Sequence, residues 1–190
     1  MVITEIFKSI QGEGTRAGLP CIFVRLTGCN LRCTWCDTAY AFHGGKKMTV
    51  EEIVARVDDL SGRARDAKAA GAAVPLVELT GGEPLLQEEV YPLAESLLAA
   101  GYTVLIETSG ERFIGRLRKE VIKIVDVKCP DSGAPDTFDM KNLAELTLND
   151  EVKFVLRTRR DYEFAREFTR HNGLARRVHQ VLFSPVFEDP

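Results

Sequence analysis

The sequence of 190 residues lacks the features that send a chain out of the cell or into a membrane. No basic segment followed by an apolar run opens it, so we expect no secretory signal. No run approaches the roughly 20 apolar residues that cross a bilayer. Lys and Arg number 25 against 28 Asp and Glu, and this balance gives no sign of a nucleic-acid surface. We expect a soluble cytoplasmic protein that binds neither membranes nor nucleic acid.

Cysteine is also scarce, and the count of five is odd. Cys29, Cys33 and Cys36 lie close together, whereas Cys21 and Cys129 stand apart. An odd count with three members clustered is a poor disulfide framework. In a chain without an export signal, clustered thiols more often bind metal or carry out redox chemistry. We therefore expect free thiols and a metal centre.

Repeats, low-complexity tracts and linkers are absent too, so we predict one domain over residues 1–190. We predict helices after a capping box at 49–52 and over 90–98 and 162–171, from capping and helical spacing. A short helix is also expected at 113–119. Six strands are expected, at 21–26, 76–79, 103–107, 122–127, 152–156 and 178–183. Because such alternation implies a parallel sheet, and six units are too few to close an eight-stranded barrel, we predict an α/β fold, an open partial (βα)6 TIM-like barrel.

Unusual polar and glycine-rich segments follow almost every predicted strand. They are the cysteine segment 29–36, then 80–84 (TGGEP), 107–110 (ETSG), 126–128 (DVK) and 184–186 (SPV). The C-terminal ends of parallel strands form one rim, which is where ligands bind in such folds. The sequence therefore predicts a functional site at that rim.

The cysteine triplet has the spacing Cys-x3-Cys-x2-Cys. Thiolates are the usual ligands of iron–sulfur clusters, and a four-iron cube held by three thiolates has one iron without a protein ligand. That iron can bind a small molecule, as a catalytic zinc does at its open position. The alternative is a zinc site completed by a distant ligand such as His43 or Cys129, but zinc loops usually pair two-residue spacings.

These motifs resemble those of the radical S-adenosylmethionine superfamily, in the cysteine spacing with Trp35 before the last cysteine and in residues 81–84 (GGEP). Residues 10–14 (IQGEG), 23–31 (FVRLTGCNL) and 36–38 (CDT) are similar to the 7-carboxy-7-deazaguanine synthase family within it. The resemblance runs from residue 5 to about residue 186. It implies a [4Fe–4S] cluster, S-adenosylmethionine and Mg²⁺ as cofactors. It also implies the conversion of 6-carboxy-5,6,7,8-tetrahydropterin to 7-carboxy-7-deazaguanine, with loss of ammonia, in queuosine and 7-deazapurine biosynthesis.

The resemblance further implies roles for single residues. The cluster is carried by Cys29, Cys33 and Cys36. Contacts to S-adenosylmethionine are implied for Trp35, Asp37, Gly82, Asp126, Val127 and Lys128. Substrate contacts are implied for Ile10, Gln11, Gly12, Arg25, Thr80 and Glu107. Thr38 matches a magnesium ligand. An arginine such as Arg25 in an apolar strand needs a buried partner or a ligand, so it suits the substrate carboxylate, with an internal salt bridge as the alternative.

Other functions and features remain open at this point. A glycyl-radical activating enzyme and a non-catalytic zinc module are the competing functions. We expect an external one-electron reductant and a homodimer, and structural or solvated roles for His43, His171 and His179. Relatives are expected to continue beyond the segment like 184–186, and no role is carried over to Pro190.

Overall fold

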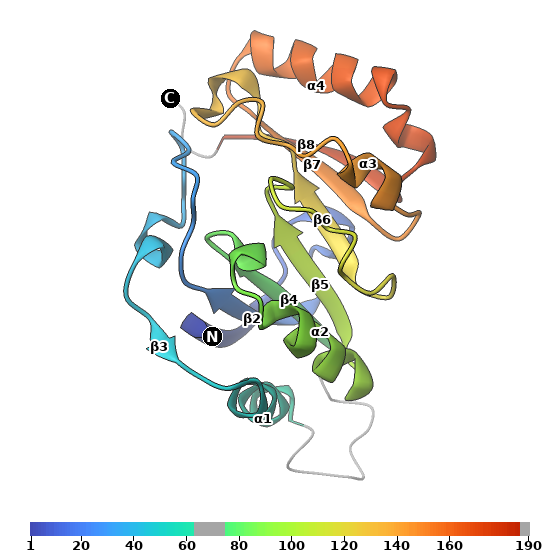
Figure 1. Cartoon of the computed structure of the whole chain (residues 1–190). Helices are drawn as coiled ribbons and strands as arrows, with labels where there is room; N and C mark the ends of the chain where they lie inside the picture. Colours follow the sequence, from blue (N-terminus) through green and yellow to red (C-terminus); the bar gives the residue numbers. More distant parts are fainter. Residues whose placement is uncertain (63–74, 187–190) are drawn as a thin grey trace.

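The computed structural model describes residues 1–62 and 75–186, and its centre is one open sheet (Figure 1). The strand order is β3-β1-β2-β4-β5-β6-β7-β8. The strands are β1 (Val2–Ile10), β2 (Pro20–Leu26), β3 (Lys46–Lys47), β4 (Leu76–Gly81), β5 (Thr103–Thr108), β6 (Ile122–Asp126), β7 (Glu151–Leu156) and β8 (Gln180–Pro185). The α-helices are α1 (Val50–Ser61), α2 (Val90–Ala99), α3 (Asn142–Glu145) and α4 (Arg159–His171).

The predicted open, partial barrel of six parallel strands is confirmed. From β2 through β4 to β8, each strand pairs in parallel with its neighbour. The first predicted strand is β2, and β1 and β3 extend this edge of the sheet as antiparallel strands that were not predicted. The predicted capping box is present, because the Thr49 side chain accepts from the Glu52 amide and Glu52 accepts from the Thr49 amide.

The short helix expected at 113–119 is wrong, because this segment forms turns. The side chain of Asn142, which is fully buried, accepts a hydrogen bond from the Ile114 amide and donates to the carbonyls of Gly110 and Arg112. These bonds hold the backbone in a loop instead of leaving it to helical pairing.

Alternate residues of the parallel strands face opposite sides of the sheet, as strand geometry requires. On β4, Val77 and Leu79 belong to the main core, which packs under the helices, whereas Glu78 and Thr80 line a cavity on the other face. α1 and α2 cover the sheet near β2, β4 and β5, and α4 packs against β7 (Figure 1). The helices therefore cover one face and leave the other for a site.

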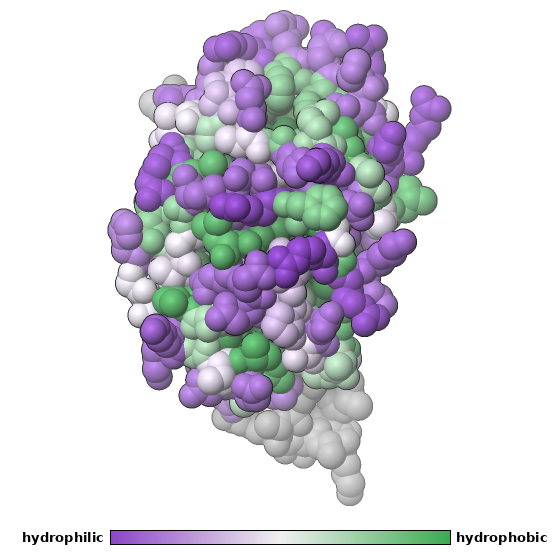
Figure 2. Space-filling view, viewed as in Figure 1, coloured by the Kyte–Doolittle hydropathy of each residue, from purple (hydrophilic) through white to green (hydrophobic). Residues whose placement is uncertain are grey.

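A second, smaller apolar cluster lies on the cavity face, toward the N-terminal ends of the strands. Its members are Cys21, Phe23, Leu76, Leu105, Ile122 and Ile124. This cluster packs on the cavity face beside the cavity, and two of its members, Phe23 and Ile124, also line the cavity. On the outside, hydrophilic and apolar side chains are interspersed over the face seen in Figure 2. No helix among the described residues is both long and apolar enough to span a bilayer.

Candidate active site

A cavity of about 790 Å³ opens at the C-terminal ends of the parallel strands. This volume lies within the range of small-molecule and cofactor pockets. Strands β1, β2 and β4 to β8 contribute to its lining, together with the cysteine loop. Of the residues named from the sequence, those at the cavity are Ile10, Gln11, Gly12, Arg25, Cys29, Cys33, Trp35, Cys36, Asp37, Thr38, Thr80, Gly82, Glu107, Asp126 and Lys128.

Val127 is the named residue that does not line the cavity. Its side chain is almost fully buried in the main core, and its amide donates to the Lys153 carbonyl. The strand alternation that directs Asp126 into the cavity directs Val127 away from it.

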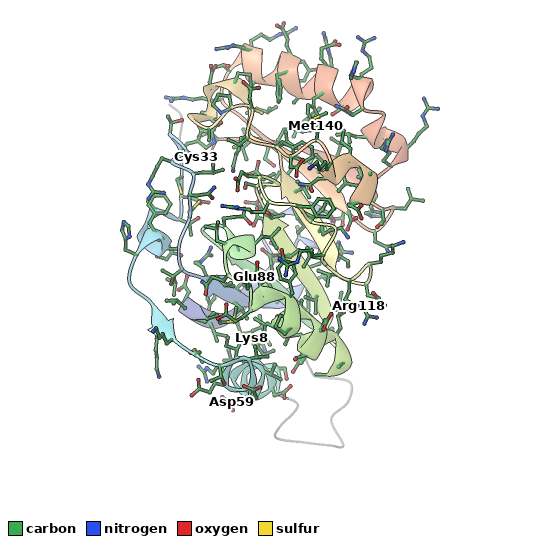
Figure 3. The ribbon with its side chains drawn as sticks, viewed as in Figure 1. Lys8, Cys33, Asp59, Glu88, Arg118 and Met140 are labelled. Carbon is green, nitrogen blue, oxygen red and sulfur yellow. The ribbon has the colours of Figure 1, made fainter. Side chains whose placement is uncertain are left out.

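The cysteine loop, residues 29–36, leaves β2 at the rim and is held in the middle by a neighbouring loop. The Thr34 amide donates to the Ser132 carbonyl at 2.8 Å. All three thiols of the loop are free and half-buried. In Figure 3, Cys33 lies in the upper left of the view and Asp59 of α1 near the bottom. All three cysteines line the cavity.

The donor set suits an iron–sulfur cube. Among the described residues, no three His, Cys, Asp or Glu side chains are arranged to hold one metal ion. A cube does not require this, since each thiolate binds a different iron corner and the ligands need not converge on a point. The three thiols line one cavity wall from one short loop, as ligands of separate corners would.

Gly82 brings the GGEP segment directly against the start of this loop. A Cβ atom at Gly82 would overlap the carbonyl oxygen of Gly28 and lie 2.7 Å from Cβ of Cys29. The Glu83 amide donates to the same Gly28 carbonyl at 2.9 Å. Only glycine permits this approach, so the two motifs are packed as one unit.

The acidic member of GGEP has a structural role. Glu83, which is almost fully buried, accepts from the hydroxyls of Thr108 and Ser109, both at 2.7 Å, and from the amides of Ser109 and Leu85. Burial raises the pKa of Glu83 in spite of these donors. The carboxyl group joins the end of β4 to the end of β5.

The two residues considered as a distant zinc ligand, His43 and Cys129, do not line the cavity with the three clustered cysteines. Cys129 is buried in the main core, where burial raises the pKa of its thiol to about 12. Cys21, the other cysteine outside the triplet, is buried in the second apolar cluster, and burial raises the pKa of its thiol to about 12. His43 stacks edge-on against Phe42 and is not part of the cavity lining.

Arg25 lines the cavity, and it also forms the internal salt bridge that was the alternative to a substrate contact. Its Nε lies 2.9 Å from the Glu5 carboxylate, which also accepts from the Tyr40 hydroxyl at 2.8 Å. The guanidinium faces the Tyr40 ring at 5.8 Å. These partners hold the charge at the cavity wall in a fixed orientation.

Glu107, which is half-buried, forms an ion pair in the cavity with the buried Lys153, and Glu13 is the second partner of Lys153 at 2.8 Å. Burial works against the charge of Glu107, but the adjacent ammonium of Lys153 lowers its pKa overall. The same carboxylates raise the pKa of Lys153 although burial opposes this. Glu107 is therefore an ionised acceptor at neutral pH.

Asp126 and Lys128 form another pair beside the cysteines, 2.7 Å apart. Burial opposes the charge of Lys128, but Asp126 raises its pKa overall. Burial raises the pKa of the Cys33 thiol, and Lys128 acts in the opposite direction. Oδ1 of Asp126 is buried without a hydrogen-bond partner among the described residues. An acceptor of this kind is suited to a polar ligand.

Thr38 closes the cysteine segment on its other side. Its hydroxyl donates to the Asp37 carboxylate at 2.5 Å. Asp37 is exposed, whereas Thr38 and Trp35 are half-buried. The hydroxyl and the carboxylate together place two hard oxygen donors at the cavity mouth.

Several cavity residues were not predicted from the sequence. They are Glu13, Tyr40, Glu78 and Lys153. Glu5 was not predicted either; it lies outside the lining, as the partner of Arg25 and Tyr40. Glu78 and Lys153 interrupt apolar strands, as Arg25 does, so the rule that supported the assignment of Arg25 could have drawn attention to them. The other three lie in polar surroundings and carry no such signal.

Comparison with known proteins gives consistent matches. The family model described as "Radical SAM superfamily" matches residues 23–128. The 7-carboxy-7-deazaguanine synthase of Koribacter versatilis is 57% identical over 188 residues, covering 98% of this chain and 78% of the relative. That of Chlorobaculum tepidum is 40% identical, covering 97% and 80%. The crystal structure of QueE from Escherichia coli matches 99% of this chain and 84% of that chain, with a TM-score of 0.73 and 26% identity.

Proposed function

The chain belongs to the 7-carboxy-7-deazaguanine synthases of the radical S-adenosylmethionine superfamily, and from this we propose how its own residues serve the reaction. The enzyme converts 6-carboxy-5,6,7,8-tetrahydropterin to 7-carboxy-7-deazaguanine with loss of ammonia. The observation that carries the residue assignments is a single cavity lined by the cysteine loop, by Gly82 and by a ring of polar side chains.

The [4Fe–4S] cluster and S-adenosylmethionine supply, when bound, the carbon radical that starts the reaction. We assign the cluster to Cys29, Cys33 and Cys36. A zinc site would instead need these thiolates and a fourth ligand to converge on one ion. Gly82 leaves room for the backbone to approach S-adenosylmethionine, and Trp35, Asp37, Asp126 and Lys128 line the wall beside it. Val127 can contribute only main-chain atoms, because its side chain is in the core.

The substrate is assigned to the other part of the cavity. Arg25 is held in a fixed orientation and suits the substrate carboxylate. The ionised carboxylate of Glu107 offers a hydrogen-bond acceptor to the heterocycle. The carboxamide of Gln11 offers both an acceptor and a donor. The remaining contacts are proposed for Ile10, Gly12 and Thr80.

Magnesium is proposed at Thr38, supported by the position of its hydroxyl at the cavity mouth beside Asp37. Mg²⁺ binds few protein oxygens and keeps several waters, so one or two side chains and substrate oxygens are enough. The assignment predicts that Thr38→Val weakens Mg²⁺ binding, so that a titration of turnover with Mg²⁺ reaches half-maximal activity at a higher Mg²⁺ concentration than in the wild type.

The remaining predictions concern the whole protein. We propose that residues 1–190 form a single radical S-adenosylmethionine domain, and that the enzyme acts as a homodimer in the cytoplasm with an external one-electron reductant. Residues 63–74 and 187–190, including Pro190, lie outside the described residues. The glycyl-radical activating alternative is set aside, since relatives that match nearly the whole chain are 7-carboxy-7-deazaguanine synthases. Light scattering tests the homodimer.

Turnover of the named substrate tests the function. Anaerobically reconstituted protein, with reductant, S-adenosylmethionine and Mg²⁺, is mixed with 6-carboxytetrahydropterin, and products are identified by mass. We expect 7-carboxy-7-deazaguanine from the wild type, and neither it nor 5′-deoxyadenosine from Cys33→Ala. 5′-Deoxyadenosine without deazaguanine, or turnover in Cys33→Ala, would contradict the assignment.

A further inference from the structure

A buried carboxyl group without a cation lies in the substrate part of the cavity. Glu78, on the cavity face of β4, is 3% exposed. Among the described residues it forms no ion pair, because the cavity lysine, Lys153, is bound by Glu107 and Glu13 instead. The partner of Glu78 is the Nε2 group of Gln11, which donates to its carboxyl oxygen. A buried carboxyl in such a place needs an explanation beyond packing.

The carboxamide of Gln11 is held at both ends. Nε2 donates to Glu78, and Oε1 accepts a hydrogen bond from the Glu13 amide at 3.1 Å. The backbone of Gln11 is fixed as well, since its amide donates to the Leu19 carbonyl and its carbonyl accepts from the Gly18 amide, both at 2.8 Å. In the opposite orientation, the amide group of Gln11 would face the Glu13 amide donor to donor. The arrangement therefore selects one of the two orientations.

The orientation of the Gln11 carboxamide decides whether it presents a donor or an acceptor to a ligand at a given place. With both ends held, Gln11 has one N–H and one oxygen lone pair left for the cavity. A freely rotating carboxamide would offer a donor or an acceptor at either place and could not distinguish an amino group from a carbonyl group.

We propose that Glu78 is a positioning residue that sets substrate specificity: it fixes the Gln11 carboxamide so that the pocket distinguishes a 2-amino from a 2-oxo group on the pyrimidine edge of the heterocycle. The proposal rests on the assignment of Gln11 to the substrate. Glu78 thus acts through Gln11, and the pocket favours a pterin, which has the 2-amino group, over a lumazine, which has a 2-oxo group in its place.

The surroundings of Glu78 are consistent with this role. Burial, and next the negative charge of Glu107, raise the pKa of Glu78 to about 8, although Lys153 acts in the opposite direction. Glu13 and the thiol of Cys21 also face it. A neutral carboxyl can accept from Gln11 without attracting a cation, so glutamine is a suitable conservative replacement.

Binding of two unreactive ligands to the holoenzyme tests the proposal. The probes are 6-carboxypterin and 6-carboxylumazine, measured anaerobically by calorimetry with S-adenosylmethionine present. We expect the wild type to prefer the pterin by about tenfold or more, as one mismatched buried hydrogen bond implies. In Glu78→Met the preference should fall to about twofold or less, and in Glu78→Gln it should stay within about twofold of the wild type. Glu95→Met, on the exposed side of α2, is the matched control.

Three outcomes would overturn the proposal: an equal affinity of the wild type for both ligands, an unchanged preference in Glu78→Met, or a lost preference in Glu78→Gln. If Glu78→Met does not fold, Gln11→Leu must show the same loss of preference while iron content stays normal. Turnover of 6-carboxytetrahydropterin by the wild type is measured in parallel. Its absence would contradict the proposed function, whereas normal turnover with unchanged preferences would contradict the role of Glu78 alone.

Discussion

Charged side chains inside otherwise apolar strands line the cavity. Arg25 on β2, Glu78 on β4 and Lys153 on β7 all point into one cavity. From the sequence, Arg25 could be assigned because a family motif surrounds it. The partners of these charges could not be assigned, because Lys153 meets Glu13 and Glu107 only when the fold brings together segments that are far apart in the chain.

Replacing Arg25 tests the substrate assignment at the level of one residue. We expect Arg25→Ala to raise KM for 6-carboxytetrahydropterin by about tenfold to a hundredfold, since a charge-assisted hydrogen bond is lost. Iron and sulfide content should be unchanged. Arg116→Ala, which removes an exposed arginine paired with Glu88, is the control. Loss of the cluster in Arg25→Ala would show a structural role for the salt bridge with Glu5 instead.

Removing Lys153 should shift the pH dependence of the enzyme. Lys153 lowers the pKa of Glu107, so this carboxylate is ionised throughout the neutral range. In Lys153→Met the pKa of Glu107 rises, and the acid becomes protonated at a higher pH. We therefore expect the acid limb of the kcat/KM profile to move to higher pH in the variant. An acid limb at the same pH in both proteins would contradict the assignment of Glu107 as an ionised acceptor.

At the scale of elements, the parallel part of the fold was predictable and its edges were not. Short apolar runs between helical patterns identified β2 and β4 to β8, because buried parallel strands are apolar on both faces. β1 is half-buried and polar at several positions, and β3 has only two residues, so neither has a strong pattern. The expected helix at 113–119 failed because Asn142, distant in sequence, binds its backbone.

The cysteine loop depends on a contact between elements that no motif records. The 3-10 turn at Pro130–Ser132 ends at Gly133, which has a φ of 80° and packs against the middle of the cysteine loop. A Cβ atom there would lie 3.0 Å from Cγ2 of Thr34 and 3.3 Å from the Arg32 carbonyl. Helix α4 holds this 3-10 turn, because the Asp161 side chain accepts a hydrogen bond from the Asp131 amide at 3.0 Å.

Two glycine variants separate backbone strain from the support of the cluster. Gly133→Ala and Gly173→Ala both place alanine at a positive φ, but the second has open space around its Cβ. We expect both to lower stability by about 1–2 kcal/mol. Only Gly133→Ala should accelerate iron release to a chelator, by several-fold, because it displaces the cysteine loop. Equal iron release from both variants would contradict this support.

At the scale of the whole molecule, the buried carboxyl of Glu78 should shape the stability curve. Its pKa in the folded state, about 8, lies above its ordinary value of 4.5. The folded state therefore binds one proton more than the unfolded state in this window, and stability falls as the pH rises from about 4.5 to about 8. The raised pKa values of Lys128 and Lys153 act only at strongly alkaline pH.

Glu78→Gln removes this contribution. We expect the fall in Tm between pH 5.5 and pH 8.5 to be smaller in the variant, corresponding to a difference on the order of 2–4 kcal/mol. Thermal unfolding of reconstituted protein at several pH values measures it, with Glu95→Gln as the control. An equal fall in Tm for Glu78→Gln and the wild type would contradict a buried carboxyl that is neutral in the folded state.

The assembly of the cavity from separate strand ends explains why its location was predictable and its interior was not. The rim follows from the order of strands and helices alone. The pairs that line it, such as Glu78 with Gln11, depend on the antiparallel pairing of β1 with β2, and β1 was not predicted. The local motifs thus identified the chemistry, and the tertiary pairing determines its specificity.

Electron paramagnetic resonance of the reduced, anaerobically reconstituted protein tests most directly whether the three cysteines hold a cluster with an iron open to S-adenosylmethionine. We predict a [4Fe–4S]⁺ signal whose g values change when S-adenosylmethionine is added, and no such signal in Cys33→Ala. A cluster signal that S-adenosylmethionine leaves unchanged, or no four-iron signal in the wild type, would contradict the assignment.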